Sequence, residues 1–410
     1  MTQPPSLHDT PVAGSAVLGR LSPSLALIAR LAGRLRRGTL HLNLPGRPTI
    51  TCRGSENGPE ADLTIHSGRL ARRYFLHGSV GVADAYVAGE WETSDLPALL
   101  ELFDRNHEAW ESGYYGSIAS RALRRLGHRL RDNTREGSRR NIHAHYDLGN
   151  EFFGAWLDRE MLYSAALFEE GAQDLDAAQA AKCRRLARMI GLEPGHRLLE
   201  IGSGWGAFAC MAAREFGARV TSITISRAQA ELARERVREA GLEGQVEIRL
   251  QDYRDIEESF DRIASIEMFE AVGERHWPDF FGKLRGCLAP GGRIGLQLIT
   301  IADPYFHAYR RSPDFIQRYI FPGGMLPSPS VLAHHYARAG LKETALHAFA
   351  HDYARTLAIW RERFERAWPH ITGQGFDERF RRLWRYYLAY CEAGFRSGSI
   401  DVRQTVLERS

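Results

Sequence analysis

The fold of this chain is decided by the stretch Arg197-Leu198-Leu199-Glu200-Ile201-Gly202-Ser203-Gly204-Trp205-Gly206. A short apolar run leads directly into alternating glycines, and an amphipathic segment, 205–216, follows. This order predicts a strand, a tight turn and a helix. Glycine permits positive φ and close approach of a ligand, and the start of the helix offers unpaired amide groups to the turn. The pattern favours a nucleotide-like ligand, and a glycine-rich turn without a ligand is the alternative.

The spacing of the glycines narrows the choice of ligand. A dinucleotide fingerprint reads G-x-G-x-x-G, whereas this chain reads Glu200-x-Gly202-x-Gly204. This form resembles motif I of the class I S-adenosylmethionine (SAM) methyltransferases, whose ligand is a sulfonium with a carboxylate tail. An acidic residue such as Glu200 is favourable near a cation and unfavourable near a pyrophosphate. The turn therefore favours SAM over NAD.

Length and composition are typical of a globular protein that is long enough to form two domains. The chain has 410 residues, of which 44% are apolar and 25% charged. Its five cysteines are odd in number and form no C-x-x-C pair, which argues against a disulfide framework or a zinc site. No metal is expected. Neither a membrane-spanning segment nor a signal peptide is apparent, so the sequence predicts a cytoplasmic protein.

Charge is distributed unevenly along the chain. The formal net charge is +4, yet residues 121–140 contain eight arginines against Asp132 and Glu136, a local charge of +6. A basic segment of this kind suits an anionic surface such as phospholipid headgroups or nucleic acid. A solvated, arginine-rich linker helix is the alternative interpretation.

The N-terminal third reads as a small α+β domain. Residues 1–20 lack periodicity and are expected to be disordered. A helix is predicted over 21–37, period-two alternation over 39–65 predicts strands, and a helix over 94–110 closes a domain spanning 21–110. The basic linker, 111–140, follows. Beyond it, His143 and His145 have no further ligands nearby and are expected to serve packing or hydrogen bonding.

Residues 141–410 form the predicted catalytic domain. Strands and helices alternate, which predicts a doubly wound α/β sheet with ligands at the carboxyl ends of its strands. An aromatic insertion at 302–329 interrupts the alternation and indicates a pocket for an apolar acceptor. The expected strands are 197–201, 219–225, 246–251, 261–267, 293–301 and 402–408, and the expected helices are 175–190, 205–216, 227–240, 275–288, 352–367 and 376–391.

Several motifs together resemble the cyclopropane fatty acid synthases, a family that includes mycolic acid methyltransferases and plant cyclopropane synthases. The matching stretches are Gly78-Ser79-Val80-Gly81, Gly89-Glu90-Trp91, His145-Tyr146-Asp147-Leu148-Gly149-Asn150, Leu199 to Gly206, Thr224-Ile225-Ser226, Gln251-Asp252-Tyr253-Arg254-Asp255, Met268-Phe269-Glu270, Tyr319 to Gly324, and Tyr353-Ala354-Arg355-Thr356. They span nearly the whole chain from about residue 75. The resemblance implies a class I SAM-dependent methyltransferase with a small N-terminal α+β, lipid-associated domain.

The resemblance also implies a reaction. SAM methylates the cis double bond of an acyl chain in a membrane phospholipid, and the resulting cation loses a proton and closes to a cyclopropane. Glu270 and Tyr353 would hold a bicarbonate ion that takes this proton, and Cys391 matches a cysteine near the active site. A structural ion pair for Glu270, a buried helix tyrosine for Tyr353 and a buried thiol for Cys391 are the alternatives.

For SAM, the resemblance points to residues around the turn and at the ends of the next strands. Gln229 could equally complete a capping box with Ser226. Thr224 stands where many nucleotide sites carry an acidic residue, which favours this family over a generic SAM site. The implied residues are Tyr163, Ser164, Glu200, Gly202, Gly204, Thr224, Ile225, Gln229, Asp252 and Tyr253.

Three departures from the family pattern leave the product open. Bacterial members often have cysteine at the position of Ala165 and histidine at that of Ala271, so a bicarbonate contact near Ala165 must use the backbone. Gln297 replaces a histidine on the strand after the Pro-Gly-Gly turn and cannot titrate. In this the chain resembles the branch with plant enzymes and methylene-forming actinobacterial methyltransferases. A methylene- or methyl-branched acyl chain is therefore the alternative product.

The expected partners follow from the same resemblance. The N-terminal domain and basic linker predict peripheral contact with an anionic membrane at its inner face, together with a possible homodimer, and no nucleic-acid partner is expected. A lipid- or SAM-binding protein without catalysis is the rival from another class, and a nucleic-acid methyltransferase is a distant third.

Overall fold

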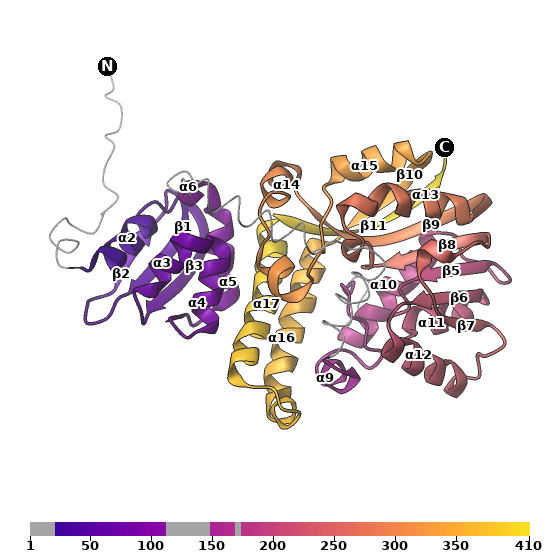
Figure 1. Cartoon of the computed structure of the whole chain (residues 1–410), viewed down its shortest axis with the longest axis horizontal. Coiled ribbons are helices and arrows are strands. Elements are labelled where there is room, and N and C mark those ends of the chain that lie inside the picture. Colours follow the sequence, from indigo (N-terminus) through magenta and orange to yellow (C-terminus); the bar gives the residue numbers. More distant parts are fainter. Residues whose placement is uncertain (1–20, 112–147, 169–173) are drawn as a thin grey trace, which may run out of the picture. The chain divides into compact units, whose positions relative to one another are not determined.

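The computed structural model describes residues 21–111, 148–168 and 174–410 and divides the chain into two compact units (Figure 1). The first unit comprises the described residues up to 111 together with residues 377–397, and the second comprises the remainder. The predicted disorder of residues 1–20, nearly all of the predicted linker, and His143 and His145 lie outside the described residues. The helix predicted over 376–391 therefore groups with the N-terminal unit, although the sequence placed it in the catalytic domain.

The first unit is an α+β module with a four-stranded sheet. The strands lie in the order β2-β1-β3-β4, with β1 and β3 parallel and the two outer pairs antiparallel. Its elements are α2 (Pro23–Ala32), β1 (Arg37–Asn43), β2 (Ile50–Arg53), β3 (Glu56–Ile65), α3 (Arg69–His77), α4 (Ser79–Val87), β4 (Trp91–Glu92), α5 (Leu96–Arg105), α6 (His107–Glu111) and α17 (Glu378–Ser397).

Two of the motifs quoted for the resemblance, Gly78-Ser79-Val80-Gly81 and Gly89-Glu90-Trp91, hold α3, α4 and β4 together. A Cβ on Gly81 would lie 2.1 Å from the carbonyl oxygen of Arg73, so only glycine allows α4 to approach α3 this closely. The Arg73 guanidinium donates to both carboxylate oxygens of buried Glu90 at 3.0 Å, and the Trp91 indole donates to Val82 O at 2.9 Å. Glycine, glutamate and tryptophan therefore have structural roles here.

The helix predicted over 21–37 is wrong in its C-terminal part. Helix α2 ends at Ala32, and β1 already begins at Arg37. The backbone amides of Arg36 and Arg37 donate to the Asn106 side chain at 2.8 and 2.9 Å, so they take no part in a helix. This tertiary hydrogen bonding overrides the apolar periodicity of the segment.

Helix α17 packs against α5 and α4 within the first unit. Arg382 donates to Tyr86 O at 2.7 Å and places its guanidinium 4.4 Å from the centre of the Tyr86 ring. Tyr386 contacts the same ring, with 5.6 Å between the ring centres. A helix late in the sequence thus completes the core of the N-terminal unit.

The second unit contains a seven-stranded sheet in the order β10-β11-β9-β8-β5-β6-β7. Strands β5 to β9 are parallel and β11 runs antiparallel to both of its neighbours. Its elements are α9 (Asn150–Gly154), α10 (Leu175–Met189), β5 (Arg197–Ile201), α11 (Ala207–Phe216), β6 (Arg219–Thr224), α12 (Arg227–Glu239), β7 (Val246–Leu250), η1 (Tyr253–Asp255), β8 (Phe260–Ile266), η2 (Phe269–Ala271), η3 (Glu274–His276), α13 (Trp277–Cys287), β9 (Leu288–Ile301), α14 (Asp303–Tyr309), η4 (Ile316–Ile320), α15 (Pro329–Arg338), β10 (Leu341–Ala348), α16 (Ala350–Gly373) and β11 (Ile400–Arg409).

Two hydrophobic cores cover the two faces of this sheet. Leu198 and Val406 belong to the core built with α10, α11 and α12, whereas their neighbours Leu199 and Leu407 belong to the core built with α13 and α15. Successive side chains of a strand point to opposite faces, so this division is the signature of a sheet buried on both sides. The predicted doubly wound α/β fold is confirmed.

The order in which strands are added to the sheet reverses between β5 and β8. Strands β6 and β7 extend the sheet on one side of β5, and β8 and β9 extend it on the other. Ligands of such sheets bind at the carboxyl ends of the strands near this switch point. Helix α15 and strand β10 had no predicted counterpart. The aromatic insertion contains α14 and the π-helix η4. In the part of the chain that the structure describes, no helix is both long and apolar enough to cross a lipid bilayer.

Candidate functional site

The glycine turn after β5 has the backbone that its sequence predicts. Gly202, Gly204 and Gly206 all have positive φ, of 96°, 49° and 88°. A Cβ on Gly202 would lie 3.2 Å from the Met268 side chain, whereas a Cβ on Gly204 would meet nothing within 4 Å. Helix α11 starts at Ala207 without a side-chain cap. The turn therefore offers open space and the start of a helix, which fits a ligand with a carboxylate tail.

Glu200 lies beneath the turn in a buried polar network. Its Oε2 atom is 2.5 Å from the Ser222 hydroxyl, which in turn is 2.7 Å from the Ser203 hydroxyl. Burial raises the pKa of Glu200 to about 8, against the lowering effects of Ser222 and of Lys182. Lys182 is fully buried and donates to Ser164 Oγ at 2.6 Å. The predicted SAM residue Ser164 is thus held by a lysine on α10.

The end of β6 carries the next predicted SAM residues. Thr224 donates to Gln229 Oε1 at 2.8 Å, and both side chains are buried. Ser226 caps α12 by accepting from the Gln229 amide at 3.4 Å, but its own amide donates to Thr224 Oγ1. Only half of the expected capping box forms, because the Gln229 side chain is engaged by Thr224. Ile225 is half-buried in the bend between them.

The remaining predicted SAM residues lie after β7 and before α10. The Asp252 carboxylate is buried and accepts from the Arg254 side chain at 2.9 and 2.7 Å. Tyr253 stacks edge-on against Phe280, and burial raises the pKa of its hydroxyl to about 12. Tyr163 lies in an aromatic cluster with Phe153, Trp156 and Trp360. These positions are placed in the second unit, and their contacts with SAM stay predictions.

Glu270 lies in η2, just beyond β8. Its Oε1 atom accepts from the Ile299 amide at 2.6 Å, and its Oε2 atom is buried without a hydrogen-bond partner among the described residues. Burial and the nearby Glu267 charge raise the pKa of Glu270 to about 8. Its backbone carbonyl accepts from Met325, which ties the aromatic insertion to this residue.

Tyr353 contacts Glu267, a glutamate that the resemblance did not single out. Its hydroxyl donates to Glu267 Oε2 at 2.7 Å. Glu267 Oε1 accepts from the Ala165 amide and from Gln297 Nε2, both at 2.8 Å. Burial raises the pKa of this carboxyl, while the hydrogen bonds from Tyr353, Gln297 and Ala165 act to lower it. Glu267 therefore stands at the centre of the predicted catalytic group.

The orientation of Gln297 is set by a second glutamine. Gln404 on β11 lies opposite Gln297 on β9 in the antiparallel register. Gln404 Nε2 donates to Gln297 Oε1 at 3.0 Å and also to Lys182 O at 3.0 Å. Because its carbonyl is engaged in this way, Gln297 presents its amide hydrogens to Glu267.

The Tyr353-Ala354-Arg355-Thr356 motif holds the loop that carries Ala165. Thr356 Oγ1 accepts from the Ala166 amide at 3.1 Å, and Asp352 accepts from the Phe168 amide at 3.2 Å. Arg355 places its guanidinium 4.0 Å from the centre of the Phe168 ring. The first turns of α16 therefore position both Tyr353 and the loop beside Glu267.

Cys391 is the remaining residue that the resemblance suggested for catalysis. It lies half-buried on α17, within the first unit, and forms no disulfide. Its predicted catalytic role stays a prediction.

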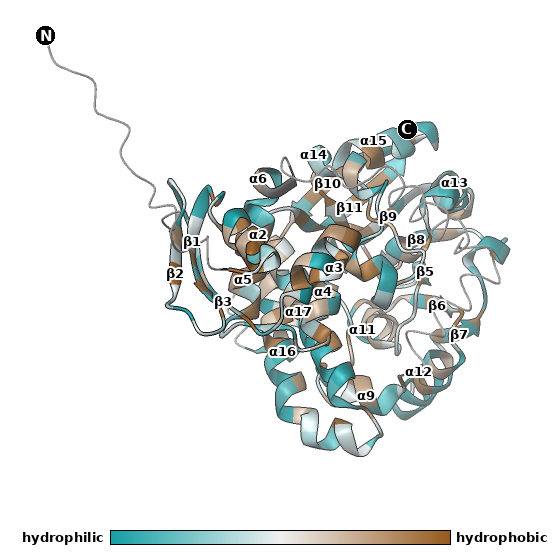
Figure 2. Cartoon of the chain, turned by 60° about the vertical axis from the view of Figure 1, so that its left-hand side comes forward, coloured by the Kyte–Doolittle hydropathy of each residue, from teal (hydrophilic) through white to brown (hydrophobic). Residues whose placement is uncertain are grey.

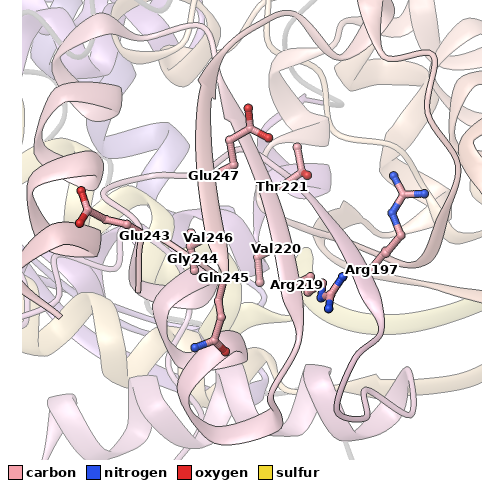
Figure 3. Close-up of a pocket in the computed structure, with 9 residues that line it drawn as sticks. All are labelled: Arg197, Arg219, Val220, Thr221, Glu243, Gly244, Gln245, Val246 and Glu247. Carbon is pink, nitrogen blue, oxygen red and sulfur yellow. The ribbon is translucent and has the colours of Figure 1, made fainter. Parts of the chain in front are cut away.

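A hollow of about 220 Å³ lies at the opposite edge of the sheet (Figure 3). It is lined by Arg197, Arg219 and Val246, the first residues of β5, β6 and β7, and by the turn that precedes β7. Ligands of doubly wound sheets bind at the carboxyl ends of the strands, so this amino-terminal hollow does not belong to the candidate site.

Three residues of the site escaped the sequence reasoning: Glu267, Lys182 and Gln404. Glu267 directly follows β8 and Glu200 is the last residue but one of β5, so an acidic residue at a strand end was a usable signal. Lys182 is one of only three lysines in a chain that otherwise uses arginine. Gln404 carried no signal, because its role depends on the register between β9 and β11.

Comparison with known proteins gives a consistent assignment. A family described as mycolic acid cyclopropane synthetase matches residues 133–405. A tuberculostearic acid methyltransferase of Mycobacterium tuberculosis is 39% identical, covering 94% of this chain and 93% of its own length. The cyclopropane-fatty-acyl-phospholipid synthase of Escherichia coli strain K12 is 36% identical, covering 85% of this chain and 88% of its own.

Solved structures show the same likeness over the second part of the chain. A cyclopropane synthase from Mycobacterium tuberculosis superposes with a TM-score of 0.62 at 32% identity, covering 66% of this chain and 97% of that one. A mycolic acid cyclopropane synthase complexed with SAH and CTAB gives a TM-score of 0.62 at 31% identity, covering 66% and 98%.

Proposed function

Because the chain belongs to the mycolic acid cyclopropane synthetase family, we propose that it methylates the cis double bond of an unsaturated acyl chain in a membrane phospholipid. The coarser activity, SAM-dependent methyl transfer to lipid acyl chains, follows from the family and the relatives. The double bond, the phospholipid and the product are the proposed part.

The residues present fit SAM. The open space over Gly204, the uncapped start of α11 and the Thr224–Gln229 pair lie at the carboxyl ends of β5 and β6. When bound, SAM supplies the methyl group that converts the double bond into a carbocation. Gly202, Gly204, Thr224, Ile225 and Gln229 would hold it there.

The observation that carries the proposal is a pair of carboxyl groups beside the glycine turn. Glu267 and Glu270 flank Met268, whose side chain faces Gly202 at 3.2 Å from an ideal Cβ. A methylated alkene becomes neutral again only by losing a proton, so this chemistry needs an acceptor close to the methyl donor. The resemblance gives bicarbonate as this acceptor and a cyclopropane as the product.

A second candidate product is a methylene- or methyl-branched acyl chain. The relative aligned over 94% of this chain is named for methyl transfer and not for ring formation. Gln297, engaged between Gln404 and Glu267, is a non-titrating residue where many bacterial members are expected to carry histidine. A ring and a methylene branch arise from the same cation by loss of one proton, whereas a saturated methyl branch would in addition need a hydride from a separate reductase.

The test is lipid analysis in an oleate-rich bacterial host that expresses the chain. We expect phospholipid acyl chains that have gained one CH2 group, and a host carrying Glu270→Gln should lack them while the purified variant still binds SAM. Mild hydrogenation separates the products, because a methylene group takes up hydrogen and a ring does not. Absence of any modified acyl chain, with purified protein inactive on olefinic phospholipid vesicles, would leave the non-catalytic alternative.

We further propose that α3 docks the first unit on an anionic phospholipid bilayer. Phe75 and Leu76 are 39% and 48% exposed, and Arg69 and Arg72 are exposed on the same helix. Figure 2 shows hydrophilic and hydrophobic residues adjacent to one another along α3. Exposed apolar side chains next to arginines match the boundary between headgroups and acyl chains.

A further inference from the structure

Glu267 has a backbone that a residue with a side chain rarely adopts. Its φ is +47°, and Met161 is the other non-glycine residue with positive φ in the described parts of the chain. The Glu267 amide donates to Gln297 O at 2.7 Å, which fixes this conformation at the end of β8. Strained backbone of this kind persists where the surrounding structure enforces it, and it often marks a functional position.

The Glu267 carboxyl is surrounded by donors. Tyr353 donates to Oε2, and the Ala165 amide and Gln297 donate to Oε1. A carboxylate has two lone pairs on each oxygen. Those of Oε1 are both engaged, and Oε2 keeps one lone pair that no described residue uses. An environment of three donors stabilises the charged form, and the remaining lone pair is placed to accept a proton from a ligand.

Glu270 is three residues further along the chain than Glu267, and the setting of its carboxyl group is the opposite. It has a single donor, the Ile299 amide, and its Oε2 atom has no partner among the described residues. The pKa of Glu270 is about 8, because burial and the Glu267 charge both disfavour ionisation. Two neighbouring buried carboxyls disfavour being ionised together. The three donors around Glu267 favour the charge on that residue, whereas Glu270 has one donor and is the weaker candidate for the base.

We infer that Glu267 is the proton acceptor of this chain and occupies the place of an added bicarbonate ion. Bicarbonate is itself a carboxylate bearing a hydroxyl, so it would need the donors that Glu267 already engages. These include Tyr353 and the backbone amide of Ala165, which are two of the contacts that the resemblance implies for bicarbonate. The inference rests on the proposed function, since it names the base of that same reaction.

The proton step balances without any further reagent. A C–H bond of the added methyl group breaks, and the proton moves to the remaining lone pair on Glu267 Oε2. For a cyclopropane, the released electron pair forms the third ring bond to the cationic carbon. For a methylene branch, a hydride first shifts between the two former alkene carbons, and the pair then forms the new C=C bond. In each case the acyl chain becomes neutral and Glu267 becomes a carboxylic acid.

Bicarbonate dependence separates the two bases. We expect wild-type turnover on olefinic phospholipid vesicles to be unchanged in carbonate-free buffer under argon. Glu267→Gly accepts the positive φ and opens the space of the carboxyl group, so it should lose at least about a hundredfold of activity without bicarbonate and regain part of it when bicarbonate is added. Glu267→Gln fills the same space with an amide and should not recover. Glu257→Gln, at an exposed position, is the matched control.

A binding measurement decides the matter without turnover. In 13C NMR with labelled bicarbonate, Glu267→Gly should show saturable binding that Tyr353→Phe weakens, and the wild type should show none. SAM binding by each protein reports that the variants are folded. Saturable bicarbonate binding by the wild type, or wild-type activity that disappears with bicarbonate, would overturn the inference. A wild type that turns over no lipid would instead count against the proposed function, and the binding result would still stand.

Discussion

The Tyr353 hydroxyl donates a 2.7 Å hydrogen bond to Oε2 of Glu267, although the two residues are 86 positions apart. This contact joins the first turn of α16 to the end of β8 beside the glycine turn. It places Glu267, in addition to Glu270, among the buried carboxyl groups of the candidate site.

Removing the Tyr353 hydroxyl should therefore change the pH dependence of the reaction. The hydrogen bond acts to lower the pKa of Glu267, so Tyr353→Phe raises that pKa. The base must be ionised, hence the acid limb of the kcat profile should move to higher pH and activity at neutral pH should fall by about tenfold or more. Tyr336→Phe is the matched control, because its buried hydroxyl has no hydrogen-bond partner among the described residues. An unchanged acid limb in Tyr353→Phe would contradict the assignment.

The raised pKa of Glu270 predicts how the free energy of unfolding depends on pH. Its pKa is about 8 in the folded state and near 4.5 in the unfolded chain, so the folded state holds an extra proton between these values. Stability from this group is present below pH 4.5 and is lost as the pH rises to 8, by up to about 1.4 kcal/mol per pH unit. Glu270→Gln should remove this part of the loss, measured by urea unfolding at pH 5.5 and 7.5. Parallel losses in wild type and variant would refute it.

The glycine turn offers a matched pair of substitutions for SAM binding. Gly204 and Gly195 both have positive φ, and a Cβ on either would meet nothing within 4 Å. At either position, substitution by alanine should lower the free energy of unfolding by about 1–2 kcal/mol through backbone strain. Only Gly204 lies where SAM is expected, so calorimetry should show at least about tenfold weaker SAM binding for Gly204→Ala and little change for Gly195→Ala. Equal effects would mean that the space over Gly204 is not used.

Membrane docking through α3 is testable with vesicles of defined charge. Arg69→Gln with Arg72→Gln should abolish the preference for phosphatidylglycerol vesicles and the sensitivity of binding to salt. Phe75→Ser with Leu76→Ser should weaken binding by at least about tenfold at every lipid charge. Leu250→Ser with Leu346→Ser removes two other exposed apolar side chains and should have no effect. Vesicle binding that survives both α3 variants would remove α3 from the interface.

The fold could be predicted from the sequence because its signals are local. The run from Arg197 to Gly206 specifies a strand, a turn and a helix start through short-range periodicity and glycine placement, and the repeated alternation after it specifies a parallel sheet. The helix predicted over 21–37 failed at its end for a non-local reason. The amides of Arg36 and Arg37 find a partner in Asn106, some 70 residues later.

The site was predictable only in part, for the same physical reason. The resemblance selected Glu270, Tyr353 and Gln297, and the structure places all three around the end of β8, while their roles in catalysis stay predictions. That Tyr353 contacts Glu267 depends on how α16 meets β8, and the orientation of Gln297 depends on Gln404 across β11. Neither the Tyr353–Glu267 contact nor the Gln404–Gln297 contact can be predicted from local sequence periodicity.

Helix α17 has a consequence for how the chain acquires its structure. Helices α4 and α5 leave the ribosome early, yet α17, which packs against them, is synthesised only after most of the second unit. The chain then returns to lay β11 between β9 and β10, which brings Gln404 to the site. A nascent chain stalled before residue 377 would leave α4 and α5 without α17 and the large sheet without β11, so neither unit is complete until this later part of the chain has been made.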